Sequence, residues 1–168
     1  MVRALEFLGD SRPAFVAHLA ERLTEALCRS TQMLADENQL KAPIRTHSIL
    51  LYLMDGGPAS LAEIARSDGQ SHQLVASRLK PLEELGLIER QVDPKDARRR
   101  PYQLSRSGRT EAQAIRGAIG AHARAMEALF AETGVDLVKA LDEALEALRL
   151  RPLAERIAEV QPDARAAA

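Results

Sequence analysis

The chain has 168 residues, of which 46% are hydrophobic, with one cysteine and a formal net charge of −1. That length suits one domain or one compact subunit, and a single cysteine excludes an internal disulfide and fits a reducing cytoplasm. No apolar run approaches the roughly 18 residues of a membrane span, and the N-terminus lacks a basic start followed by an apolar segment, so no signal peptide is evident. A cytoplasmic protein without a membrane segment is expected.

The first predicted element is a long helix near the N-terminus. Residues 1–11 are ambiguous and fit a short helix. Ser11–Pro13 then fits a helix start, with a hydroxyl at the N-cap and a proline in the first turn. Apolar residues at helical spacing extend this helix to about Asp36. Their stripe is wider than one small domain could cover, which indicates that it is partly a dimer face: Phe15, Val16, Leu19, Leu23, Ala26, Leu27 and Leu34.

A second helix is predicted after a polar connection over residues 36–42. Pro43 starts this helix, and its strongly apolar residues should pack beneath the later helix that begins at Ser71. Gly56–Pro58 breaks it, because glycine and proline disfavour a continuing helix. His47 lies within it, where a packed or surface position is favoured over a place in a ligand pocket.

Residues 59–108 have the order helix, turn, helix, glycine, strand, charged turn, strand. Gly69 ends the first of these helices, at a position where a left-handed backbone costs least. Ser71 is the predicted N-cap of the second, because its hydroxyl can accept an unpaired backbone N–H. The first helix has one apolar face at i, i+3 and i+4: Leu61, Ile64 and Ala65.

The second of these helices has two predicted faces. At about 100° per residue, the buried face consists of Val75, Leu79, Leu82 and Leu85. The opposite face consists of Gln73, Ser77 and Lys80, with Ala76 beside them. A glutamine amide can pair with adenine, a serine hydroxyl with several base edges, and an alanine methyl with the methyl of thymine. This face is therefore predicted to enter a major groove.

A hairpin follows the two helices. Gly86 ends the helix and Leu87–Val92 is predicted as a strand. Asp93–Asp96 has turn chemistry, and Arg98–Arg100 follows it directly. Pro101–Leu104 is the return strand, with the proline at a strand start or edge, where its missing N–H is tolerated.

The charge of this hairpin differs from that of the whole chain. From Arg90 to Arg109 there are seven Lys or Arg residues against two Asp, so the acidic excess lies in the flanking helices. Contact with phosphates needs a localised basic surface and does not need global basicity. Three consecutive arginines alone are typical of a solvated turn, but at the tip of a hairpin after a two-helix unit they indicate nucleic-acid binding.

Two further helices are predicted after the hairpin. Ser105 begins a long helix with a near-heptad apolar seam, and Gly134 closes it. Val135 opens a final helix that Pro152 kinks or restarts, and the residues from Gln161 form a frayed tail. The seam is too short and irregular for a free-standing coiled coil, so pairing with the first helix of a second subunit explains it better.

The middle third of the chain contains three short motifs: Leu82-Glu83-Glu84-x-Gly86-Leu87-Ile88, Asp93-Pro94-x-Asp96-x-Arg98 and Leu104-Ser105-x-x-Gly108. These motifs resemble the MarR family of bacterial transcription regulators, and the spacing between them matches that of the family without a gap. The resemblance implies that Arg98 reaches into a minor groove while Asp96 holds its guanidinium. It also implies a small-molecule effector in a cleft between the dimer helices and the winged module, with phenolic or aromatic acids as a family-level guess.

Some positions depart from the family pattern. Asp68 and Gln70 flank the turn glycine, where hydrophobic residues are usual. Ser77 stands where the family has an arginine, and Arg78 comes one residue later. Pro81 lies inside the recognition helix, removes one N–H and should kink the helix there. The half of the helix that would meet DNA lies upstream of this proline.

The resemblance leaves two interpretations of Cys28, in the first long helix. Some members of the family sense oxidants through a cysteine in their first helix, which makes a peroxide-sensing thiol one interpretation. A small core residue is the commoner role of a free cysteine and is the favoured interpretation.

We therefore predict a mainly α fold with a small β-hairpin wing, a winged helix-turn-helix with N- and C-terminal dimerisation helices. The predicted division is residues 1–42 and 109–161 for dimerisation, 43–108 for DNA binding and 162–168 as a disordered tail. The predicted function is a ligand-responsive repressor, acting as a homodimer on a pseudo-palindromic site in double-stranded DNA. The candidate DNA contacts are Ser71, His72, Gln73, Ser77, Arg78, Lys80, Lys95, Asp96, Arg98, Arg99 and Arg100.

Other classes of function were weighed against this one. A Gly-rich phosphate loop, a serine elbow and paired carboxylates are all missing, and the four histidines include no i, i+4 pair, so no enzyme, metal site or cofactor is predicted. A winged helix used only for protein–protein interaction is the main alternative, although its recognition face is usually apolar or acidic. A PadR-like regulator shares the winged module, but the long helix before the module fits the MarR family better.

Overall fold

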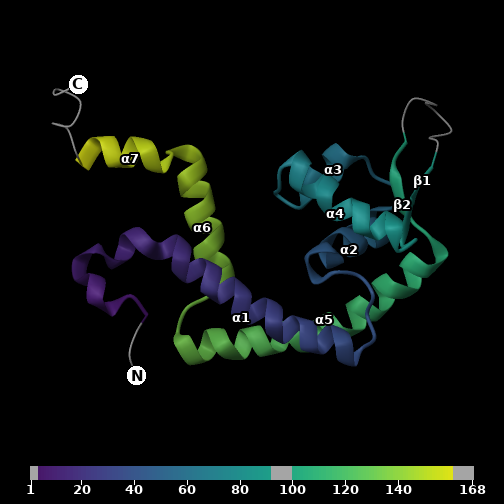
Figure 1. The fold of residues 1–168 in the computed structure, drawn as a ribbon, viewed down its shortest axis with the longest axis horizontal. Coiled ribbons are helices and arrows are strands. Elements are labelled where there is room, and N and C mark those ends of the chain that lie inside the picture. The colour runs from purple at the N-terminus through teal and green to yellow at the C-terminus, as the bar shows by residue number, and fades with distance from the viewer. Residues whose placement is uncertain (1–3, 92–99, 161–168) are drawn as a thin grey trace. The chain divides into compact units, whose positions relative to one another are not determined.

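The computed structural model describes residues 4–91 and 100–160 (Figure 1). It divides into two compact units, residues 1–120 and 121–168, and each is described by itself. The predicted fold class is confirmed, because the described residues are mainly helical, with a two-stranded antiparallel sheet.

The first unit contains the predicted helix-turn-helix and its hairpin. Figure 1 shows α2, α3 and α4 gathered beside the two strands, with α5 following the second strand. In chain order the elements are the 3-10 helix η1 (Glu6–Phe15), α1 (Val16–Glu37), the 3-10 helix η2 (Ile44–Thr46), α2 (His47–Gly56), α3 (Leu61–Ser67), α4 (His72–Glu84), β1 (Ile88–Arg90), β2 (Tyr102–Leu104) and α5 (Arg106–Thr133), which continues into the second unit.

The predicted start of the first long helix is wrong. α1 begins at Val16, and Pro13 lies inside η1, three residues earlier. Phe15 occupies the N-cap position of α1 and makes no side-chain cap hydrogen bond. The Ser11 hydroxyl therefore does not cap α1, because a tight 3-10 segment occupies the place where that cap was expected. The predicted end near Asp36 is confirmed, since α1 ends at Glu37.

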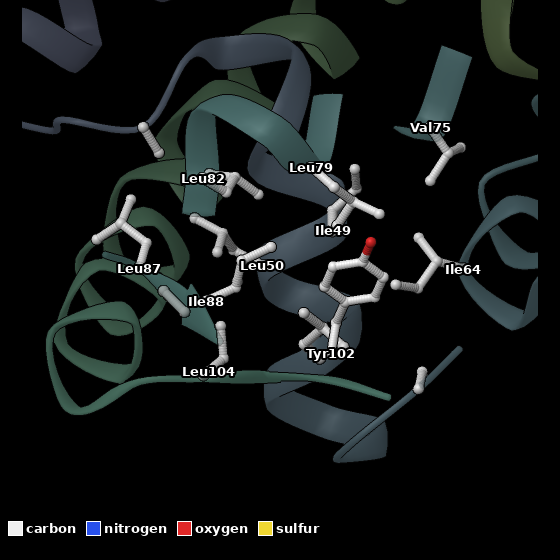
Figure 2. Close-up of a cluster of buried hydrophobic side chains, with 14 of the residues drawn as sticks. Ile49, Leu50, Ile64, Val75, Leu79, Leu82, Leu87, Ile88, Tyr102 and Leu104 are labelled. Atoms are coloured by element: carbon white, nitrogen blue, oxygen red, sulfur yellow. The ribbon is translucent and has the colours of Figure 1, made fainter. Parts of the chain in front are cut away.

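One buried cluster holds α2, α3, α4, both strands and the start of α5 together (Figure 2). The predicted buried face of α4 is confirmed for Val75, Leu79 and Leu82, which are 0% to 1% exposed. Burying a side chain of this size contributes about 1.5–3 kcal/mol. Leu85 was predicted on the same face, but it is the C-cap residue and is 45% exposed. The helix ends before Leu85, so the residue leaves the buried stripe.

The predicted boundaries of the two central helices are largely confirmed. Ser71 caps α4, and its Oγ accepts the Leu74 N–H at 3.2 Å. Gly69 has a φ of 63° just after α3, the left-handed conformation that glycine adopts most easily. A capping box that was not predicted starts α3, where the Ser60 hydroxyl and the Glu63 backbone and carboxylate bond reciprocally. α4 continues through Pro81 to Glu84, and the predicted kink stays a prediction.

The hairpin is joined to α5 by a close backbone approach. The strands pair Ile88 with Leu104 and Arg90 with Tyr102. The Ser105 Oγ accepts the Gly108 N–H at 3.0 Å and donates to the Gly86 carbonyl at 2.6 Å. A Cβ on Gly108 would lie 1.8 Å from the carbonyl oxygen of Leu87. Packing of α5 on the hairpin therefore needs both a serine and a glycine in the piece Leu104-Ser105-x-x-Gly108.

The second unit contains the end of α5, α6 (Leu137–Leu150) and α7 (Leu153–Val160). Gly134 closes α5 as predicted, with a φ of 70°. The predicted opening of the next helix at Val135 is wrong, because Asp136 is the N-cap and accepts the Lys139 N–H at 3.0 Å. The predicted restart at Pro152 is confirmed. Among the described residues, no helix is both long and apolar enough to cross a membrane.

Candidate nucleic-acid interface

The outward face of α4 brings together several of the predicted contacts. Ser71, His72 and Gln73 are exposed at its N-terminal end. Lys80 follows further along, with 78% of its side chain exposed and its ammonium 3.9 Å from the Glu84 carboxylate. The buried stripe fixes this arrangement, because residues on the opposite side of a helix must face solvent when one side is packed.

Two side chains on this face keep hydrogen-bonding capacity for a ligand. The Ser77 hydroxyl donates to the Leu74 carbonyl at 2.7 Å, which leaves its oxygen free to accept. The Gln73 amide makes no hydrogen bond to another described residue, so both its donors and its acceptor remain available.

Arg78 is placed differently from the other predicted contacts. Its Nη1 donates to Oδ2 of Asp68 at 2.9 Å, and the two side chains are 20% and 15% exposed. The other oxygen of Asp68 accepts the Ser48 hydroxyl at 2.9 Å. Arg78 therefore points to the turn between α3 and α4, and its charge is balanced within the protein.

The base of the hairpin is fixed by Arg90, which was not among the predicted site residues. Its Nε donates to the Glu83 carboxylate at 3.1 Å, and Nη2 donates to the Tyr102 hydroxyl. The guanidinium carbon also lies 4.5 Å from the centre of the Tyr102 ring. Burial raises the pKa of the Tyr102 phenol above its usual value. An aromatic residue opposite an arginine in the hairpin register was the sequence signal for this contact.

Arg100 is exposed at the start of the return strand. It lines a cavity of about 300 Å³ together with Ser60, Ala76 and Arg90. Lys95, Asp96, Arg98 and Arg99 lie outside the described residues, so their roles at the tip of the hairpin stay predictions. Arg100 thus brings positive charge to the side of α4 that carries Ala76, whereas the charge of Arg90 is paired with Glu83.

A second polar network lies between α1 and α2. The Glu111 carboxylate of α5 accepts the backbone N–H groups of Lys41 and Ala42. His47 Nε2 lies 3.1 Å from the Ala42 carbonyl. Burial lowers the pKa of His47, while that hydrogen bond and the charge of Glu111 act in the opposite direction. His47 is thus half-buried and bonded within the protein, and the favoured interpretation of a packed or surface position over a ligand pocket stays a prediction.

A second cavity of the first unit lies beside α2, β2 and α5. Its volume is about 170 Å³, and it is lined by Met54 of α2, Gln103 of β2 and Arg109 of α5. Cys28 is half-buried in α1, and the choice between a core residue, the favoured interpretation, and a peroxide-sensing thiol stays untested. No group of three or more potential metal ligands occurs among the described residues.

These features define a class of protein. A short helix, a tight turn and a second helix with an exposed polar face are followed by a two-stranded hairpin with basic residues at its base. This is a winged helix-turn-helix, a fold that places its second helix against nucleic acid.

Residues 41–99 match a family model described as the MarR family. The predicted resemblance to the MarR family is therefore confirmed over the winged helix-turn-helix, the part of the chain that this model matches. A comparison with curated protein sequences found no match.

Solved structures share this fold. One described as a MarR family transcription regulator is 24% identical, covering 94% of this chain and 99% of that chain, with a TM-score of 0.54. The MepR–DNA complex of S. aureus is 22% identical, covering 79% and 97%, with a TM-score of 0.64. The transcriptional repressor CouR, bound to a 23-mer DNA duplex, is 22% identical, covering 83% and 96%, with a TM-score of 0.58.

Proposed function

We propose that this protein is a transcription regulator that binds double-stranded DNA in a sequence-specific manner. The observation that carries the proposal is the exposed polar face of α4, held outward by the buried residues Val75, Leu79 and Leu82. The two relatives described as bound to DNA, MepR and CouR, support it because they have the same fold.

Each side chain on the face has a defined role in the proposal. Gln73 and Ser77 contact base edges in the major groove, since amide and hydroxyl groups can pair with them. Ser71 and His72 lie at the N-terminus of α4, where the helix dipole favours a phosphate. Lys80 and Arg100 contact phosphates and set affinity. The same role extends to Lys95 and Arg99, while Arg98 enters the minor groove with Asp96 holding it, as the family resemblance implies.

A homodimer is the second part of the proposal. α6 and α7 expose apolar side chains that a second copy of the chain would cover, since large exposed apolar patches mark interaction sites. A two-fold axis between two winged modules then requires a pseudo-palindromic site with half-sites about one helical turn apart.

Repression and response to a small molecule complete the proposal. A protein seated over a promoter blocks transcription, and CouR is described as a repressor. An effector that binds one spacing of the two α4 helices better than another would shift the population between them. The effector's chemistry is open, and phenolic and aromatic acids are the first class to test.

Selection of binding sites from a random duplex pool, followed by sequencing at defined salt, tests this function. The expected result is a two-fold symmetric motif with half-sites one helical turn apart. Salt-sensitive binding without a motif would contradict sequence specificity and indicate a non-specific architectural protein. No binding at low salt would contradict DNA binding itself and favour the protein–protein interaction module.

A further inference from the structure

The turn between α3 and α4 contains a side-chain network that lies outside the proposed DNA-reading face. Asp68, the C-cap residue of α3, accepts one hydrogen bond on each carboxylate oxygen. The hydroxyl of Ser48, in the first turn of α2, donates to Oδ1 at 2.9 Å. Arg78, in the middle of α4, donates to Oδ2 at 2.9 Å. One carboxylate therefore links α2, α3 and α4.

The burial of this pair distinguishes it from the other ion pairs of the winged module. The side chains of Arg78 and Asp68 are 20% and 15% exposed, whereas those of Lys80 and Glu84 are 78% and 64% exposed. Exposed pairs contribute little, but breaking a shielded pair leaves one charge desolvated and uncompensated. If Arg78 turned outward to a phosphate, Asp68 would be left as an unpaired anion at the DNA-facing turn.

We propose that Arg78 is a positioning residue for DNA recognition, acting through Asp68 and Ser48, and that it does not itself contact DNA. Apolar packing of Val75 and Leu79 decides which face of α4 is buried, but such packing is non-directional. A charged hydrogen bond adds a direction and fixes the rotation of α4 about its axis, and hence the direction in which Gln73 and Ser77 point. This positioning role then explains why Asp68 carries a carboxylate where hydrophobic residues are usual in the family pattern.

The consequence for DNA rests on the proposed function, so the experiment has one arm with DNA and one without. In the first arm, D68N, R78Q and the double variant are compared with wild type on a selected duplex and on an unrelated duplex, across a salt series. K80Q is the matched control, because it removes a cation of the same helix that is proposed to contact phosphate.

If Arg78 has the positioning role, D68N and R78Q each lower the ratio of specific to non-specific affinity about tenfold. The double variant loses no more than either single variant, because both remove the same link. The slope of log affinity against log salt is unchanged in R78Q and falls by about 0.9 for each lost phosphate contact in K80Q. A reduced slope in R78Q, with specific binding retained in D68N, would overturn the proposal in favour of a direct phosphate contact.

The second arm is hydrogen exchange of the free protein. D68N and R78Q should accelerate exchange of the α4 amides about tenfold while K80Q leaves it unchanged, because only the first two free α4 from α2 and α3. Unchanged exchange in D68N and R78Q would overturn the positioning role whatever the DNA result. If wild type binds no duplex but exchange accelerates as expected, the proposed function fails while the positioning of α4 stands.

Discussion

α4 and α6 have the same apolar periodicity and opposite burial. The stripe of α4 is 0% to 1% exposed: Val75, Leu79 and Leu82. The stripe of α6 is 44% to 65% exposed: Val138, Leu141, Leu145 and Leu148. The stripe on α4 is covered by α2, α3 and the hairpin of the same chain. The periodicity of apolar residues therefore shows that a helix face packs against another surface, but it does not show whether that surface belongs to the same chain.

The largest expected effect is a difference in folding stability between substitutions in the buried stripe of α4 and in the exposed stripe of α6. Leu79→Ala should lower the free energy of unfolding by about 2–5 kcal/mol, because it leaves a cavity in a packed core. Leu145→Ala is the matched change on the exposed stripe and should cost less than half as much. Urea denaturation of both variants at one protein concentration measures this, and equal losses would break the comparison.

The second test concerns what covers α6. The double substitution L141E/L145E should raise the dissociation constant of the proposed homodimer about 100-fold or more, because it would place two charges in an apolar interface. K139E is the control, since it changes the net charge equally at a side chain that is 72% exposed. Analytical ultracentrifugation across a concentration series measures both variants. An unchanged dimer in L141E/L145E would show that α6 is not at the interface.

A third test compares two glycines of α5. Gly108→Ala should destabilise the fold by about 1–3 kcal/mol, because its Cβ would lie 1.8 Å from the Leu87 carbonyl oxygen. The new Cβ of Gly117→Ala meets no described residue within 4 Å, and the substitution should stabilise the helix by up to about 1 kcal/mol. Thermal unfolding gives both values. A loss at Gly117 similar to that at Gly108 would indicate a close approach by a second copy there.

The smallest expected effect is a pH dependence at His47. Burial lowers its folded pKa below the reference value of 6.5, so the unfolded state binds more protons below that pH. Its contribution to stability is therefore complete above pH 6.5 and is lost as pH falls from there towards the folded pKa. His47→Gln should flatten this part of the stability–pH curve, measured by urea unfolding. His18→Gln, at an exposed position of α1, is the matched control, and a curve unaltered by His47→Gln would contradict the assignment.

Most of the correct predictions of helix boundaries from the sequence rest on local backbone chemistry. The N-cap at Ser71, the left-handed glycine at Gly69 and the end of α5 at Gly134 depend on backbone preferences that act within a few residues. Where several local solutions compete, the predicted boundaries were wrong, as at Ser11 and Val135. There a 3-10 segment and a cap at Asp136 replaced the expected starts.

The amino-acid sequence by itself determined the order of elements, the buried and exposed faces of α4 and the family resemblance of the winged module, because periodicity, caps and turn residues are local properties. Only the tertiary structure decided that Arg78 bonds to Asp68, that Arg90 fixes the hairpin base and that Gly108 meets the Leu87 carbonyl. Those contacts depend on the distance between elements separated along the chain, and a spacing rule for one helix or strand contains no such distance.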